Sequence, residues 1–123
     1  MHSILVIEDD SELRQVLRLT LAAAGYEVKT AIDGKAAESL FRSQPPDLVI
    51  TDIYMPNKDG LEVIMELRAS FPQTQIIAIS GQVSTKNMLS VAGALGAVRT
   101  LRKPFLPEEL LQLVEEALAS SKD

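Results

Sequence analysis

Short apolar runs alternate with segments of helical periodicity along the chain. Strand-type runs cover residues 3–7, 26–30, 48–51, 76–79 and 97–101. Most of these runs are continuous and rich in β-branched residues, which is typical of strands buried on both faces of a parallel sheet, whereas 26–30 alternates as an edge strand would. The repeated strand–helix alternation predicts an α/β domain in which helices cover both faces of one parallel sheet.

The segments between the strands carry the usual signals of helix ends. We expect one helix ending before Gly25, one over 34–43, one from about 61 to Phe71-Pro72, one closing at Gly96, and one beginning near Pro107. The apolar stripes include Val16 in the first helix and Met65 in the third. Asp10 and Asp33 are placed to cap the first two helices, since an Asp side chain accepts hydrogen bonds from free backbone N–H groups. Leu106 cannot do so, and the last helix is expected to be weakly capped.

The composition is that of one soluble globular domain. The chain has 123 residues, of which 46% are hydrophobic and 24% charged. The net charge of −5 argues against a nucleic-acid-binding surface. The absence of cysteine excludes disulfides, thiolate nucleophiles and cysteine metal sites. Because the chain enters its first strand without a basic segment or a long apolar stretch, we expect no membrane insertion and a cytoplasmic location.

Polar groups follow four of the strands at the points where they end. Glu8 and Asp9 follow the first strand, Asp52 the third, Ser80 the fourth, and Lys103 comes shortly after the fifth. Sites in open α/β sheets form outside the carboxyl ends of the strands, so these side chains are expected to converge on one edge. Carboxylates, a hydroxyl and an ammonium together suit Mg²⁺ and a phosphoryl group.

Each of these residues also has an ordinary structural interpretation, as a helix cap, a loop acid or a surface lysine. In the functional interpretation, Asp52 attacks phosphorus and forms an acyl phosphate, while Glu8 and Asp9 hold Mg²⁺. Ser80 would donate to a phosphoryl oxygen and Lys103 would pair with the phosphoryl charge. Crowding of three carboxylates is unfavourable without a cation, so Mg²⁺ is expected to stabilise the fold.

The ordered motifs closely resemble the receiver domain of two-component response regulators over the whole chain. They are Glu8-Asp9, Asp52-x-x-Met55-Pro56-x-x-Asp59-Gly60, Ser80-Gly81 and Lys103-Pro104-Phe105. The resemblance implies a flavodoxin-like, doubly wound (βα)5 fold with a five-stranded parallel sheet of order 2-1-3-4-5. We expect the receiver domain to span residues 1–119, followed by a C-terminal tail over 120–123 and no output domain.

The resemblance also assigns roles to the site residues. Asp52 would accept a phosphoryl group from a histidine kinase or histidine phosphotransfer protein, and Ser80 and Lys103 would contact that group. Asp9, Asp52 and the backbone carbonyl of Tyr54 would bind Mg²⁺, with Glu8 acting mainly through water. The chain would be a regulatory phosphoacceptor rather than an enzyme, apart from its own phosphorylation and dephosphorylation.

The sequence departs from the family pattern at the surface that should respond to phosphorylation. Thr100 stands where family members usually have Tyr or Phe, three residues before the lysine. It has no ring to move between buried and exposed positions. Coupling to the switch surface, which includes Thr100 and Met88, is therefore expected to be weaker or to run through loop backbone and the fourth helix. The output partner stays unknown.

Two other functions stay open at this stage. An aspartyl phosphohydrolase or phosphotransferase would use the same Asp, Lys and Mg²⁺ set, but Tyr54 stands where its acid would be expected, and the chain leaves no room for a substrate-selecting cap. A scaffold receiver that binds partners without phosphorylation is disfavoured by the intact acidic pocket and kept open by Thr100.

Overall fold

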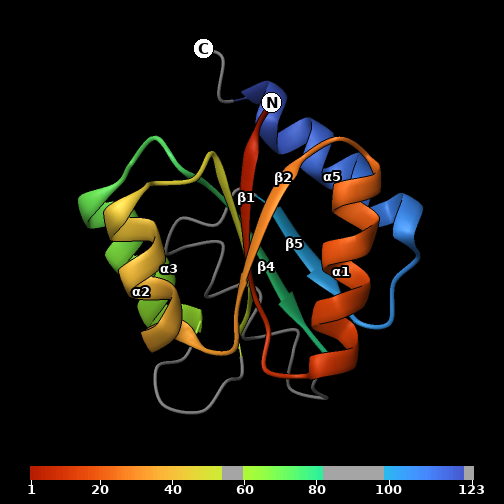
Figure 1. Ribbon diagram of the computed structural model, residues 1–123, viewed down its shortest axis with the longest axis horizontal. Coiled ribbons are helices and arrows are strands. Elements are labelled where there is room, and N and C mark those ends of the chain that lie inside the picture. The colour runs from red at the N-terminus through yellow and green to blue at the C-terminus, as the bar shows by residue number, and fades with distance from the viewer. Residues whose placement is uncertain (54–59, 82–98, 121–123) are drawn as a thin grey trace.

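The computed structural model describes residues 1–53, 60–81 and 99–120. Its elements are β1 (Ser3–Ile7), α1 (Ser11–Ala23), β2 (Glu27–Ala31), α2 (Gly34–Ser43), β3 (Leu48–Asp52), α3 (Gly60–Ser70), β4 (Gln75–Ser80), β5 (Arg99–Arg102) and α5 (Pro107–Ser120). The strands form one parallel sheet in the order β2-β1-β3-β4-β5 (Figure 1). The predicted α/β fold and strand order are confirmed. The expected helix closing at Gly96 lies outside the described residues.

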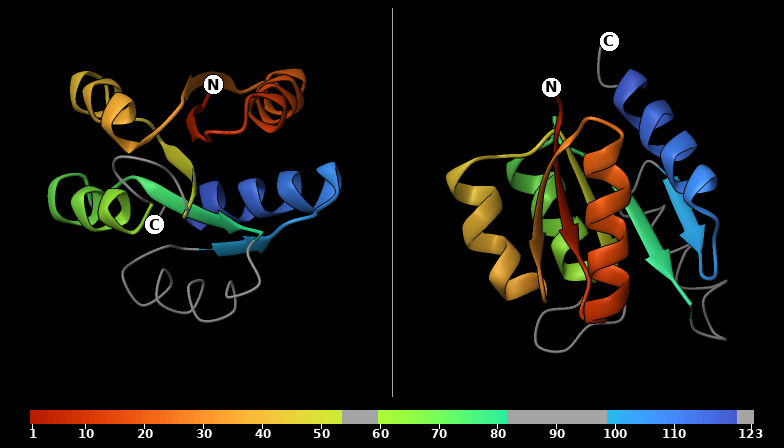
Figure 2. Two further views of the ribbon diagram at one scale, coloured as in Figure 1. Left: turned by 90° about the horizontal axis from the view of Figure 1, so that it is seen from below. Right: turned by 45° about the vertical axis from the view of Figure 1, so that its right-hand side comes forward.

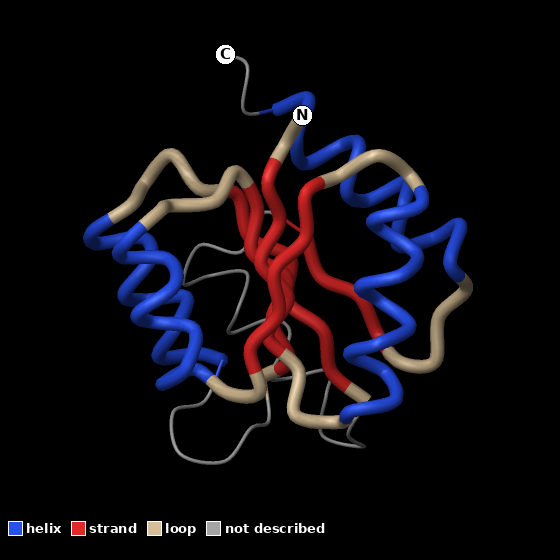
Figure 3. Tube along the Cα trace, viewed as in Figure 1, coloured by secondary structure: helices blue, strands red, loops and turns tan. Residues whose placement is uncertain are grey.

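The sheet is the middle layer of the molecule, with helices packed on both faces. α1 and α5 lie on one face, and α2 and α3 lie together on the other (Figures 1 and 2). In Figure 3 the strands run between these two sets of helices. No helix in the described part of the chain is long and apolar enough to cross a membrane.

The two-residue periodicity of the inner strands divides the core into two clusters, since successive strand residues point to opposite faces. The cluster under α1 and α5 includes Ile4, Val6, Ile50, Ile77 and Ile79 from the strands, with Leu17, Leu21, Leu110 and Val114 from the helices. The cluster under α2 and α3 includes Leu5, Ile7, Val49, Ile76 and Ala78 from the strands, with Phe41, Ile64 and Leu67 from the helices. The sheet is thus held rigidly from both sides, and its carboxyl edge is a stable platform for side chains.

Several boundaries differ from the prediction by one or two residues. β2 begins at Glu27 because the N–H of Tyr26 donates to the carbonyl of Leu21 and still closes α1. β5 continues to Arg102, which pairs with Ser80 across the ladder; residues 97 and 98 of the predicted strand lie outside the described part. Asp52 and Ser80 are the last residues of their strands rather than loop residues. Both are therefore positioned by the sheet itself.

The predicted helix caps are present. Asp10 accepts hydrogen bonds from two first-turn N–H groups of α1, at 3.0 and 3.2 Å. Asp33 caps α2 in the same way, with one bond of 2.8 Å. The sequence predicted a weakly capped start for α5, since Leu106 has no capping side chain. In the structure the carboxylate of Glu109 accepts a hydrogen bond of 2.8 Å from the Leu106 N–H, so this backbone group has a partner.

The buried apolar stripes of α1 and α3 are narrower than the stripes predicted from the sequence. Val16 and Met65 were both assigned to these stripes, yet their exposed fractions are 53% and 55%. Each lies next to a residue that fills the core, Leu17 in α1 and Ile64 in α3. The neighbouring position on a helix is turned about 100° away, which is enough to place it in solvent.

Candidate functional site

The site lies where the strand order reverses. β1 pairs with β2 on one side and with β3 on the other. The connections that leave the carboxyl ends of two such neighbouring strands run to opposite faces of the sheet, and a crevice is left between them. Ile7 and Thr51 are partners in the ladder, so the residues that follow them, Glu8 and Asp52, emerge side by side.

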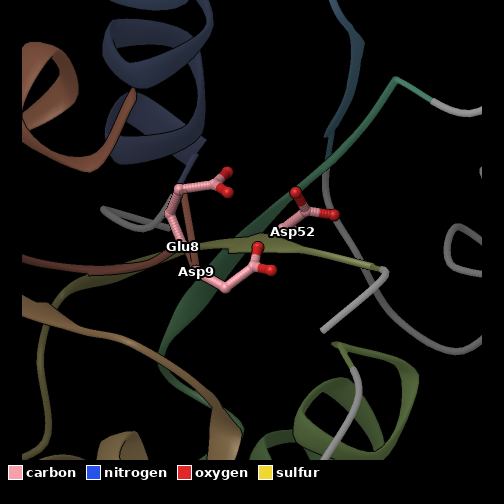
Figure 4. Close-up of side chains that lie close together, drawn as sticks. All are labelled: Glu8, Asp9 and Asp52. Carbon is pink, nitrogen blue, oxygen red and sulfur yellow. The ribbon is translucent and has the colours of Figure 1, made fainter. Parts of the chain in front are cut away.

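Three acidic side chains converge in this crevice. Oxygen atoms of Glu8, Asp9 and Asp52 all lie within 4.8 Å of one another. Figure 4 shows the carboxylates gathered around a common space, with Glu8 and Asp9 coming from the end of β1 and Asp52 from the end of β3. Glu8 and Asp52 are 1% and 6% exposed, whereas Asp9 is exposed. The cluster therefore has a buried floor and one side open to solvent.

Lys103 provides a cation at the same place. Its ammonium donates a hydrogen bond of 2.6 Å to Oδ2 of Asp52 and lies 3.1 Å from Oε1 of Glu8. The second contact is a charge contact without hydrogen-bond geometry, so Oε1 of Glu8 is buried without a hydrogen-bond partner. The N–H of Lys103 donates to the carbonyl of Ser80 at 2.9 Å. The peptide bond between Lys103 and Pro104 is cis.

The pKa values show that this single ammonium does not balance the acids. Burial, reinforced by the charge of Asp52, raises the pKa of Glu8 to about 7, although the backbone N–H of Asp10 and the ammonium of Lys103 act in the opposite direction. Burial also opposes the charge of Lys103, but Asp52 and then Glu8 outweigh it and raise the Lys103 pKa. The ammonium pairs with Glu8 and Asp52, and Asp9 adds a third carboxylate to the cluster, which leaves an excess of negative charge suited to a further cation.

Gly60 allows the backbone of Asp52 to lie against the start of α3. A Cβ atom at Gly60 would come within 2.8 Å of the Ile53 Cα and even closer to the carbonyl oxygen of Asp52. The Gly60 N–H also donates to the Ile53 carbonyl at 3.0 Å. This close approach explains the glycine, which the sequence presented only as part of a motif.

The structure places the other predicted residues as follows. Ser80 is fully buried at the end of β4. Thr100 is exposed on β5. Tyr54 and Met88 lie outside the described residues.

Arg14 was missed by the sequence analysis. Its Nη1 donates to the carbonyl of Glu8 at 2.8 Å and lies 3.5 Å from the carbonyl of Asp9. Its position in the sequence could have indicated a role. A cation near the beginning of a helix interacts unfavourably with the helix dipole, so a compensating contact is expected there. Arg14 is the fourth residue of α1.

An open groove runs from Lys103 along α1. Its walls, which are mostly apolar, are formed by Leu13, Val16 and Thr20 of α1, by Pro104 and Phe105 of the loop before α5, and by Pro107, the first residue of α5. Lys103 lines the groove and also contacts the acids, so the groove and the acidic site are continuous.

Fold and site together define a flavodoxin-like α/β domain with an acidic pocket and a lysine at the switch point of its sheet. The sequence model of the response regulator receiver domain family matches residues 4–115. The chain therefore belongs to this family, the receiver domains of two-component systems. Receiver domains of this family are regulatory and interact with histidine kinases.

Curated relatives agree with this assignment. The response regulator MprA of Mycolicibacterium vanbaalenii is 41% identical over 108 residues, which are 88% of this chain and 46% of that protein. MprA of Mycobacterium tuberculosis is 37% identical over 119 residues, or 97% of this chain and 51% of that protein. The chain thus spans about half the length of the curated relatives it matches.

Solved structures show the same architecture. A response regulator receiver domain protein from Clostridium thermocellum superposes with a TM-score of 0.92 at 30% identity, covering 99% of this chain and 98% of that one. The receiver domain of NtrX from Brucella abortus superposes with a TM-score of 0.89 at 30% identity, covering 94% and 98%.

We expect Gly60→Ala to lower the free energy of unfolding by about 1–3 kcal/mol, because the new methyl group overlaps the Asp52 backbone. Urea denaturation measures this. Where the backbone permits it, the same exchange stabilises a protein by about 0.4–1 kcal/mol, so unchanged or increased stability would contradict the close approach.

The raised pKa of Glu8 predicts a pH dependence in metal-free protein. Its folded pKa of about 7 lies above the unfolded value of 4.5, so its stabilising contribution is complete below pH 4.5 and is lost as the pH rises through 7. Glu8→Gln, which stays neutral, should therefore gain stability relative to the parent between about pH 5 and 8, by on the order of 1–3 kcal/mol at the upper end. Denaturation in EDTA across this range tests the prediction.

Glu27→Gln is the matched control, because it removes the same charge from an exposed position on β2. Its stability relative to the parent should change little with pH. A difference between Glu8→Gln and the parent that stays constant from pH 5 to 8 would mean that Glu8 does not titrate in this range.

Proposed function

We propose that this protein is a phosphorylation-controlled switch in which Asp52 accepts a phosphoryl group from a histidine kinase or histidine phosphotransfer protein. The observation that carries the proposal is the environment of Asp52. Its carboxylate stands at the end of a buried strand, receives a 2.6 Å hydrogen bond from Lys103, and belongs to a cluster with Glu8 and Asp9. A nucleophile, a fixed cation and an acidic pair are thereby combined at one point.

The transfer itself needs no proton donor within the pocket. An oxygen of the Asp52 carboxylate forms a bond to phosphorus while the bond from phosphorus to the donor's histidine nitrogen breaks, and that nitrogen keeps the electron pair. Lys103 pairs with the phosphoryl oxygens as a point charge. Ser80, buried at the adjacent strand end, contributes its hydroxyl to the same group.

The acidic cluster fits Mg²⁺. Hard carboxylate oxygens are the ligands this ion prefers, and the buried Oε1 of Glu8 accepts no hydrogen bond although the Lys103 ammonium lies 3.1 Å away. Asp9, Asp52 and the carbonyl of Tyr54 would hold the ion, with Glu8 acting through water. When bound, Mg²⁺ would neutralise charge on the phosphoryl oxygens during transfer.

The response to phosphorylation would begin with the main-chain hydrogen bond that joins the end of β4 to the residue after β5. The carbonyl of Ser80 accepts from the N–H of Lys103, so the two phosphoryl contacts are linked through the main chain. Thr100 lies on β5, the strand that precedes Lys103, two residues before its end, and offers no ring to change rotamer. We assign the switch surface to Thr100 and Met88, with the signal carried by backbone shifts.

The groove along α1 fits the phosphoryl donor. It opens directly beside Lys103, and a helix bearing the phosphohistidine could lie on its apolar wall while presenting the phosphoryl group to Asp52. Such docking would explain why Val16 is exposed, because an apolar side chain on the rim of a docking groove contributes to binding.

Phosphorylation at Asp52 is tested with a small phosphodonor and Mg²⁺. The parent protein should take up one phosphoryl group and shift on a phosphate-affinity gel, whereas Asp52→Asn, which lacks the anionic nucleophile, should not. Absence of uptake by the parent, or equal uptake by the variant, would overturn the assignment. Steady turnover of phosphate esters would instead support the phosphohydrolase alternative.

Docking of the donor is tested with Val16→Glu. With a histidine kinase that phosphorylates the parent, the transfer rate at limiting receiver should fall about tenfold or more, since a buried charge replaces an apolar contact. Labelling by the small phosphodonor should be unchanged. Met65→Glu makes the same exchange at a similarly exposed position on α3 and should affect neither reaction. Equal effects of the two variants would exclude the groove as the docking site.

A further inference from the structure

The loop between β1 and α1 consists of three residues, Glu8, Asp9 and Asp10. The first two belong to the acidic cluster, whereas Asp10 caps α1. The loop is fastened at both ends. The N–H of Glu8 donates to the carbonyl of Ala31 at 3.0 Å, and the N–H of Asp10 donates to Oε2 of Glu8 at 3.1 Å. Asp9 lies between these bonds and is exposed, so burial cannot fix the direction of its carboxylate.

Arg14 reaches back from α1 to this middle residue. Its Nη1 lies 2.8 Å from the carbonyl oxygen of Glu8 and 3.5 Å from that of Asp9. These carbonyls belong to the two peptide groups that flank the Asp9 Cα. Because the peptide group is planar, holding both carbonyls limits the rotations that aim the Asp9 side chain. The guanidinium thus acts on Asp9 through its backbone and has no contact with its carboxylate.

The position of Arg14 has an electrostatic disadvantage. A cation near the beginning of α1 opposes the helix dipole, and it stands close to a site that we propose for another cation. If Arg14 acted only through its charge, it would repel Mg²⁺ and its removal would strengthen metal binding. The two carbonyl contacts indicate the opposite role.

We propose that Arg14 is a positioning residue, which orients Asp9 for divalent-metal binding by holding the carbonyl groups on either side of it. This inference rests on the proposed function, because it assumes that Asp9 is a metal ligand. Groups that orient metal ligands typically change metal affinity by about 10- to 100-fold when they are removed. The role is separable from folding, since α1 is already capped by Asp10 and anchored by Leu17 and Leu21.

The test compares Arg14→Met, which keeps an unbranched stem but removes the charge and the donors, with Arg14→Lys, which keeps the charge and one donor group. Mn²⁺ serves as the probe, and its affinity is measured by electron paramagnetic resonance. We expect affinity to fall about tenfold or more in Arg14→Met and to be partly restored in Arg14→Lys. The rise in melting temperature with Mg²⁺ should shrink in the same order. Arg18→Met, on the same helix and bonded to Gln15, is the control and should bind like the parent.

The outcomes are distinct. Unchanged or tighter Mn²⁺ binding by Arg14→Met overturns the positioning role and leaves the proposed function intact. A lower melting temperature in EDTA, with the parent's Mn²⁺ affinity preserved, assigns Arg14 to stability alone and also overturns the inference. If Arg14→Met does not fold, Arg14→Lys decides: weaker Mn²⁺ binding than the parent supports the inference, and binding equal to or tighter than that of the parent overturns it. No Mn²⁺ binding by the parent overturns the metal site of the proposed function and the inference with it.

Discussion

The contact of the Lys103 ammonium with Asp52 and Glu8 allows two carboxylates to be buried at the junction of β1 and β3. Without this cation, the close approach of the two strand ends would place uncompensated charge in a nearly dry environment, which is among the most unfavourable arrangements in a protein interior. These contacts also link distant strands of the sheet, because Lys103 follows β5, Glu8 follows β1 and Asp52 is the last residue of β3. The side chain of Lys103 thus links the carboxyl ends of β1, β3 and β5.

The same interaction does not fully compensate the negative charge of the site. The ammonium contacts two of the three clustered carboxylates, and the pKa of Glu8 rises to about 7 because its burial is only partly compensated. A divalent cation would relieve this imbalance, and phosphorylation would increase it by replacing the single negative charge of the Asp52 carboxylate with a phosphoryl group of about −1.5 to −2. Either event changes the electrostatic energy of a pocket built into the rigid edge of the sheet. A protein can convert such a change into a shift between two surface states.

Much of this could be predicted from the sequence, because the relevant signals are local or periodic. The strand pattern indicated the layers, and the polar residues after Ile7, Thr51 and Ile79 indicated the edge on which they meet. What could not be predicted depends on small angles and on backbone contacts. Val16 and Met65 are apolar residues at near-core positions, and only the orientation of each helix on the sheet decides that they are exposed. Gly60 and Arg14 act on main-chain atoms of residues outside their own elements, and hydrophobic periodicity carries no information about such contacts.

Under the proposed function, Thr100 would alter how the pocket communicates with the surface without altering the pocket itself. Its exposed side chain has no ring, while Lys103 and Ser80, which would both sense the phosphoryl group, are joined by a backbone hydrogen bond at the end of β4. Movement of either residue must pull on the other through that bond. The ladder then transmits the movement along β5, where Thr100 is paired with Ala78 and Arg102 with Ser80. We propose that, in this receiver, a shift of β5 as a unit would take the place of the rotamer change of an aromatic side chain as the route from the pocket to the surface.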